Sequence, residues 1–125
     1  MPKQTGPSLT AVELELMNIL WSLKSASVRE VLAELPKSRQ MAYTSASTII
    51  RILEQKGYVK AEKQGKTHFY SPILTKKEYS KTTLKQVVTN LFDGEPTQLI
   101  RQLINNEKLD KDEIAEIKKI IKEQL

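Results

Sequence analysis

The chain has 125 residues, 39% of them hydrophobic, and a formal charge of +5, as expected for one compact domain or a small domain with an oligomerisation arm. It contains no cysteine, which excludes disulfides and thiolate metal sites. No apolar run approaches the roughly 18 residues of a membrane span, and the N-terminus lacks the layout of a signal peptide. We therefore expect a cytoplasmic protein without membrane insertion.

The excess positive charge is concentrated between residues 36 and 72. This stretch holds seven Lys and Arg residues against two Glu residues, so it accounts for the net charge of the whole chain. A local basic surface indicates a polyanionic partner such as nucleic acid. A solvated lysine-rich face would have the same composition, so charge alone leaves both interpretations open.

Helix starts are predicted where Ser, Thr or Asp precedes Glu by three residues, because the two side chains can then cap the first turn reciprocally. Four such pairs precede apolar residues at helical spacing: Thr10–Glu13, Ser27–Glu30, Thr75–Glu78 and Asp110–Glu113. A further helix is predicted after Gly94 and Pro96. Trp21 lies at helical spacing and is expected to be a core residue.

A third helix and a hairpin are predicted between the second and third of these pairs. We expect Thr44 to cap the helix, which reaches about Lys56 and ends at Gly57. The apolar period then changes to about two residues in "YVKAEK" and "THFYSPI", and Gly65 in "QGK" suits a tight turn. The predicted fold class is mainly α with a small β-hairpin wing: a winged helix-turn-helix over residues 1–74 and a helical dimerisation region over residues 75–125.

The third helix has two distinct faces. Apolar residues at helical spacing are predicted to face the core: Ala46, Ile49, Ile50 and Leu53. The opposite face carries short hydroxyl groups and one guanidinium: Thr44, Ser45, Ser47, Thr48 and Arg51. A helix cap needs only one hydroxyl, so this surplus favours a recognition helix that reads base edges in the major groove. Lys63 and Lys66, near the hairpin tip, are expected to contact a flanking phosphate.

Other classes of function have weaker support. No paired carboxylates, nucleophile–base set or phosphate loop is recognisable, so we expect no enzyme, catalytic residue, metal or cofactor. His68, the only histidine, is predicted to be a surface or packing residue because its segment offers no further metal ligands. The alternative function is a protein–protein assembly module without DNA binding. Such a module should expose apolar residues on the third helix, where Ile52 is the one candidate.

Several segments, taken in order, resemble the penicillinase-repressor family of bacterial transcription factors, the BlaI/MecI type, which also includes copper-responsive repressors. They are "LTAVELELMNILW", "SVREVL", "AYTSASTIIRILEQKGYVKAEKQGKTHFYSPIL" and "KKEY". The similarity is close over residues 9–79 and looser beyond. The resemblance implies a homodimeric repressor that binds an inverted repeat in double-stranded operator DNA.

The C-terminal stretch "LINNEKLDKDEIAEI" is similar to the family's dimerisation region. Its apolar residues recur at helical spacing in a segment too small to form a core alone, so a second copy of the chain is expected to cover them. The predicted dimerisation residues are Leu99, Ile100, Leu103, Ile104, Ile114, Ile117 and Ile121.

The chain departs from the family pattern where the family's inducing signals act. The resemblance implies inactivation by a regulatory protease at an Asn-Phe bond, but Gln102-Leu103 aligns there and Asn-Phe occurs nowhere in the chain. Copper-responsive members carry C-terminal cysteine pairs, and this chain has no cysteine. The inducing signal therefore stays open, with proteolysis elsewhere, autoregulation and a small ligand as alternatives.

Overall fold

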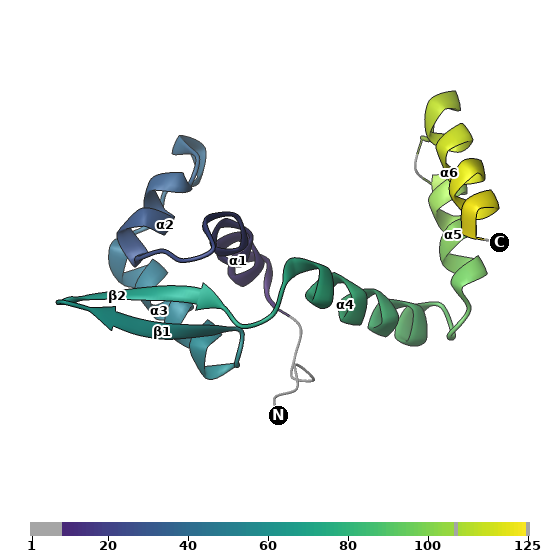
Figure 1. Cartoon of the computed structure of the whole chain (residues 1–125). Helices are drawn as coiled ribbons and strands as arrows, with labels where there is room; N and C mark the ends of the chain where they lie inside the picture. Colours follow the sequence, from purple (N-terminus) through teal and green to yellow (C-terminus); the bar gives the residue numbers. More distant parts are fainter. Residues whose placement is uncertain (1–8, 107, 125) are drawn as a thin grey trace. The chain divides into compact units, whose positions relative to one another are not determined.

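The computed structural model describes residues 9–106 and 108–124 (Figure 1). Its elements are, in order, α1 (Ala11–Leu23), α2 (Val28–Glu34), the 3-10 helix η1 (Lys37–Arg39), α3 (Tyr43–Gln55), β1 (Val59–Gln64), β2 (Thr67–Pro72), α4 (Lys76–Leu91), α5 (Pro96–Asn106) and α6 (Lys111–Gln124). The predicted fold class, mainly helical with one antiparallel hairpin, is confirmed. No helix within the described residues is long and apolar enough to cross a lipid bilayer.

All four predicted capping pairs form reciprocal hydrogen bonds at helix starts. In the first, the Glu13 backbone N–H donates to Thr10 Oγ1 at 3.1 Å and the Thr10 N–H donates to Glu13 Oε1 at 2.9 Å. The other three pairs repeat this pattern. These bonds satisfy N–H groups that would otherwise lack a partner in the first turn of a helix.

The predicted cap of the third helix is wrong. α3 begins one residue before Thr44, and the N-cap position is Ala42, in an extended conformation with no side-chain cap. Thr44 is already inside the first turn, where its backbone carbonyl accepts a hydrogen bond from the Thr48 hydroxyl. A residue with helical dihedral angles cannot place its own side chain across the helix start, so α3 lacks a hydroxyl cap.

The core of the N-terminal part lies between α1, α2, α3 and the hairpin. Its largest fully buried side chains are Leu16, Met17, Leu20, Val31, Ile50, Leu53 and Val59. Backbone hydrogen bonds in both directions between Ala26 and Tyr70 join the hairpin to the segment between α1 and α2. The α3 face predicted to point inward does so, since Ala46, Ile50 and Leu53 are fully buried and Ile49 packs against them.

The chain divides into two compact units, one ending at Thr82 and the other beginning at Thr83. The boundary falls inside α4 because Tyr79 belongs to the first unit. Its hydroxyl accepts a hydrogen bond from the Leu9 N–H at 3.2 Å, and its ring lies 5.8 Å from Trp21 and 5.9 Å from Tyr58, between centroids. Trp21 also donates from Nε1 to the Leu74 carbonyl at 2.9 Å, so it acts in packing. The proposed functional division at residue 74 remains a prediction.

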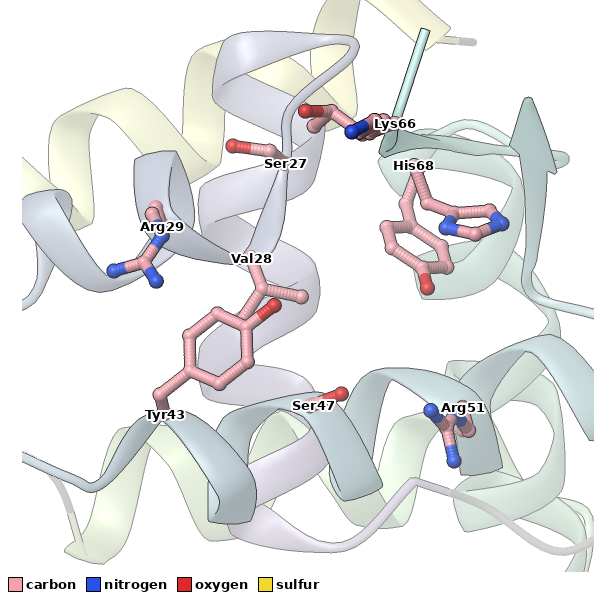
Figure 2. A pocket seen from close by; sticks show the side chains of 10 residues that line it. Ser27, Val28, Arg29, Tyr43, Ser47, Arg51, Lys66 and His68 are labelled. Atoms are coloured by element: carbon pink, nitrogen blue, oxygen red, sulfur yellow. The ribbon is translucent and has the colours of Figure 1, made fainter. Parts of the chain in front are cut away.

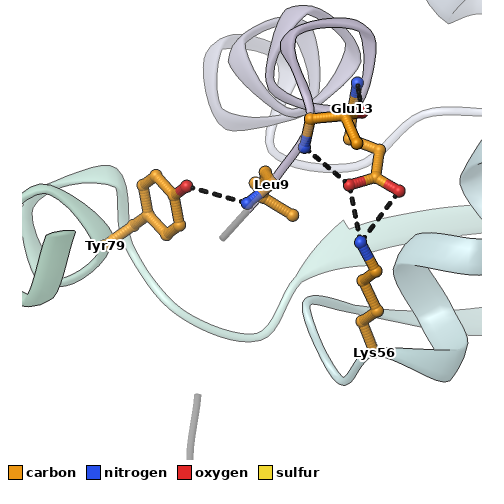
Figure 3. A network of polar contacts seen from close by, with 5 residues as sticks. Leu9, Glu13, Lys56 and Tyr79 are labelled. Atoms are coloured by element: carbon orange, nitrogen blue, oxygen red, sulfur yellow. Dashed lines mark hydrogen bonds and ion pairs between the residues drawn. The ribbon is translucent and has the colours of Figure 1, made fainter. Parts of the chain in front are cut away.

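A partly buried ion pair, in which the Lys56 side chain is 25% exposed, joins the start of α1 to the end of α3 (Figure 3). Lys56 Nζ lies 2.8 Å and 3.0 Å from the two carboxylate oxygens of Glu13, whose side chain is only 8% exposed. Burial raises the pKa of the Glu13 carboxyl, but hydrogen bonds from Lys56 and Thr10 outweigh it, so the net pKa lies below the usual 4.5. The carboxylate is therefore held ionised in the folded protein.

We predict that Glu13→Gln lowers the free energy of unfolding at pH 7 by about 1–3 kcal/mol, because it leaves the Lys56 ammonium without its counter-charge. Urea denaturation measures the difference. Glu15→Gln is the matched control: Glu15 pairs with Arg39 at 3.0 Å, but the two side chains are 29% and 40% exposed. This control should cost less than about 1 kcal/mol, as surface ion pairs do.

The stabilising effect of Glu13 should also depend on pH. A carboxyl whose pKa is lowered by folding stabilises the protein fully above its unfolded pKa, close to 4.5, and loses this effect as the pH falls through the folded value. We expect the stability difference between wild type and Glu13→Gln to shrink steadily below about pH 4.5. A difference that did not shrink as the pH fell below about 4.5, or an equal cost for Glu15→Gln, would contradict the assignment.

Candidate nucleic-acid interface

The predicted recognition residues lie on the outer face of α3. Thr44, Ser45, Thr48 and Arg51 are exposed and Ser47 is half-buried. This arrangement follows from the helical period, since Ala46, Ile50 and Leu53 anchor the opposite face in the core. A rigid helix with one buried face presents its polar side chains in fixed directions, which a surface that reads a DNA groove requires.

Thr48 differs from the other hydroxyl residues of α3. Its Oγ1 donates a hydrogen bond to the backbone carbonyl of Thr44, one turn earlier, at 2.9 Å. The single hydroxyl proton is therefore used within the helix, while the oxygen lone pairs and the methyl group remain available.

The hairpin has the tight turn that the sequence predicts. Gln64 pairs with Thr67, so Gly65 and Lys66 form a two-residue turn, and Gly65 adopts a φ of 65° that suits glycine. Lys63 and Lys66 are both exposed near this tip. Lys63 is directly paired with His68 across the two strands, which places the two side chains on one face of the hairpin.

A hollow of about 280 Å³ lies between the start of α2, α3 and the hairpin (Figure 2). It is lined by Ser27, Val28 and Arg29, by Tyr43, Ser47 and Arg51 of α3, and by Lys66, Thr67, His68 and Tyr70. Three predicted residues meet here: Ser47, Arg51 and Lys66. The other four do not line it: Thr44, Ser45, Thr48 and Lys63.

The hollow is electropositive. Arg29, Arg51 and Lys66 contribute three cationic groups, and none of the described residues that line it is acidic. Burial raises the pKa of the Tyr70 hydroxyl, and the neighbouring Glu54 raises it further, so Tyr70 is neutral at physiological pH. A polar, cationic hollow beside an exposed helix face suits an anionic ligand.

Seven of the ten residues that line the hollow were not among the predicted site residues, and Arg29, Tyr43 and His68 are three of them. Arg29 lies between Ser27 and Glu30, the capping pair of a predicted helix, so the sequence of this segment was already explained by its role as a helix start. Tyr43 was not assigned to either face of the third helix. His68 is exposed and lines the hollow, and no cluster of three metal-ligating side chains occurs in the part of the chain that is described. The local concentration of positive charge was the one available signal.

The second unit exposes apolar side chains along its helices. In α5, Ile100, Leu103 and Ile104 are 43%, 46% and 49% exposed, and Leu99 is half-buried. In α6, Ile114 and Ile121 are exposed and Ile117 is half-buried. No described residue of α4, α5 or α6 is fully buried. The helices of this unit therefore leave apolar surface of a kind that stable proteins cover with a partner.

Comparison with known proteins identifies the relatives of this chain. The family model described as Penicillinase repressor matches residues 9–123. The penicillinase repressor of Staphylococcus aureus is 28% identical over 113 residues, covering 90% of each protein. The methicillin resistance regulatory protein MecI of Mammaliicoccus sciuri is 26% identical, covering 90% of this chain and 92% of that protein.

Solved structures agree with these sequence matches. The solution structure of the DNA binding domain of the repressor BlaI is similar with a TM-score of 0.53 and 29% identity, covering 63% of this chain and 94% of that domain.

Proposed function

This chain belongs to the penicillinase repressor family, and from that premise we propose how it binds DNA. It is a DNA-binding transcriptional repressor and not an enzyme. We propose that it acts in the cytoplasm as a homodimer on an inverted-repeat operator in double-stranded DNA. The observation that carries the proposal is the exposed hydroxyl-and-arginine face of α3 beside a cationic hollow. Family membership thus favours the repressor over the assembly module.

In this proposal the two parts of the interface have different tasks. The outer face of α3 enters the major groove, where Ser45, Thr48 and Arg51 reach base edges and supply sequence preference. Thr44 and Ser47 contribute hydroxyl groups to the same face. The hairpin lies along the DNA backbone, where Lys63 and Lys66 contact phosphates and supply affinity without sequence preference.

We propose that a second copy of the chain covers the exposed apolar faces of the second unit. The contributing residues are Leu99, Ile100, Leu103, Ile104, Ile114, Ile117 and Ile121. An inverted-repeat operator matches the symmetry of a two-fold symmetric dimer, because each protomer then contacts an equivalent half-site. The division between a DNA-binding part, residues 1–74, and a dimerisation part, residues 75–125, belongs to this proposal.

Base contacts and phosphate contacts can be separated by substitution. We expect Thr48→Ala or Arg51→Ala to reduce the preference for the operator over random DNA by about 1–3 kcal/mol. Lys66→Ala should weaken binding to the operator and to random DNA alike. It should also lower the slope of log affinity against log salt concentration by about one unit per protomer. Gel shifts in titrated salt with DNA upstream of the protein's own gene measure both effects. Loss of preference in Lys66→Ala but not in Arg51→Ala would reverse the roles.

The dimer can be tested on α6. Burying an isoleucine side chain is worth about 1.5–3 kcal/mol, so Ile117→Asp should weaken the dimer strongly. Lys119→Asp is the control, because Lys119 is exposed and the helical period places it away from Ile114, Ile117 and Ile121. Sedimentation at micromolar concentration should give a dimer for wild type and the control, and a monomer for Ile117→Asp. A monomeric wild type would refute the proposed dimer.

We also propose that release from DNA does not use the family's cleavage bond or thiolate-bound copper or zinc. Gln102 and Leu103 lie inside α5 where the family has Asn-Phe, and soft metal ligands are scarce, with no Cys, one His and three Met. A regulatory protease stays a candidate partner at the break between α4 and α5, where Asp93 and Gly94 have positive φ. Regulation through the protein's own abundance is an alternative route of release that we rank equally with cleavage by a protease.

The route of release is tested in cells. We expect treatment with a β-lactam or with copper to produce no fragment of the tagged protein that ends at Gln102, followed on gels alongside a promoter reporter. Copper should also leave the purified protein bound to its operator. Clean fragments ending at Gln102, or release by copper with purified components, would contradict the proposal.

A further inference from the structure

The guanidinium of Arg29, one of the residues that line the cationic hollow, lies over the ring of Tyr43. Its Cζ atom lies 4.9 Å from the centre of the Tyr43 ring, a distance at which the ring face attracts a cation. Arg29 is exposed and forms no salt bridge within residues 9–106 and 108–124. Its donors are therefore not directed at a carboxylate of the described chain, which leaves them available to an external anion.

Tyr43 holds this arginine from another helix. It is the first residue of α3 and is 46% exposed, so its ring is not needed to fill the core. The contact joins the start of α2 to the start of α3 (Figure 2). A stacked guanidinium keeps its planar set of donors in one orientation and loses less side-chain freedom when it binds an anion.

The hairpin supplies further donors to the same hollow. Lys66 lines it from the hairpin turn and His68 from β2, and Arg51 lines it from α3. Cationic or hydrogen-bonding groups from three elements thus line a space of about 280 Å³. Such a lining suits an anionic group such as a phosphate better than an apolar ligand, which would need apolar walls.

We infer that Arg29, held by Tyr43, binds a backbone phosphate of the DNA in this hollow; the inference rests on the proposed function. The phosphate comes from the DNA backbone because the helix before a recognition helix crosses the backbone while the recognition helix occupies the groove. Arg29 then fixes how deeply and in which register α3 sits, and Arg51 reads bases from that position. Tyr43 is a positioning residue that acts through Arg29.

Salt dependence on a random-sequence duplex tests Arg29 without knowledge of the operator. Fluorescence anisotropy of the full chain should show that Arg29→Ala weakens binding about tenfold per protomer and lowers the salt slope by about 0.9. Lys119→Ala removes one exposed charge far along the chain, in α6, and should change neither value. Arg29→Lys should keep the wild-type slope but recover only part of the affinity, because lysine lacks the planar fork.

The role of Tyr43 is tested with variants that keep or remove the ring. Tyr43→Phe should bind DNA like wild type, whereas Tyr43→Leu should lose part of the affinity that Arg29→Ala loses. Adding Tyr43→Leu to Arg29→Ala should cause no further loss, because the ring acts only through the arginine. Equal losses in Tyr43→Phe and Tyr43→Leu, or additive losses in the double variant, would overturn this role. Thermal unfolding of each variant verifies that the fold persists.

A second measurement locates the phosphate. Once footprinting defines the bound site, single phosphates are replaced by uncharged methylphosphonates. In each half-site, methylphosphonate replacement at one particular phosphate should weaken DNA binding by wild type but leave DNA binding by Arg29→Ala unchanged. If wild type binds DNA with sequence preference and Arg29→Ala changes neither affinity nor slope, the phosphate site is refuted and the proposed function stands. If wild type shows no preference for any DNA, the proposed function itself fails.

Discussion

The geometry of the first unit, which ends at Thr82, depends on the carboxylate of Glu13. One of its oxygens accepts the N–H of Thr10 and so completes the cap of α1, and both oxygens hold Lys56 just beyond the end of α3. A carboxylate removed from water is costly unless it is paired and hydrogen-bonded, and here it is both. The same group therefore caps the start of α1 and holds the far end of α3, the helix proposed to read DNA.

The near end of α3 is positioned by different means. The apolar side chains Ala46 and Ile50 anchor the helix in the core, and Arg29 contacts Tyr43 at its first residue. The hairpin joins this assembly through the paired backbones of Ala26 and Tyr70, which places β2 beside α2. The cationic hollow results from these three attachments, although no single one of them creates it.

Local patterns made much of the fold predictable from sequence. The capping pairs depend on residues three apart, and Gly65 marks its turn because few other residues tolerate a positive φ. The error at Thr44 has a physical cause: Ser and Thr favour helix starts in general, but α3 begins at Tyr43, ahead of all four hydroxyl residues, so none of them occupies the cap position. The family was also recognisable, because its motifs occur in order along the chain.

The remaining features depend on contacts between residues far apart in sequence. Glu13 and Lys56 are separated by 43 positions, and no local period indicates that they meet. The hollow is assembled from α2, α3 and β2, so Arg29 and His68 each look ordinary within their own segments. The residues proposed to contact DNA and a second copy of the chain were chosen by pattern, and that choice stays a prediction.

The hydrogen bond from Thr48 to the Thr44 carbonyl has a consequence for what this residue can recognise. With its proton committed inside the helix, the hydroxyl oxygen can only accept. If α3 occupies the major groove as proposed, Thr48 suits the exocyclic amino group of adenine or cytosine, while its methyl group suits the methyl of thymine. It is a poor match for guanine, which presents only acceptors there. Rotating the side chain to donate would break an internal bond, so under this proposal Thr48 favours a base pair that turns an amino group or the thymine methyl toward it.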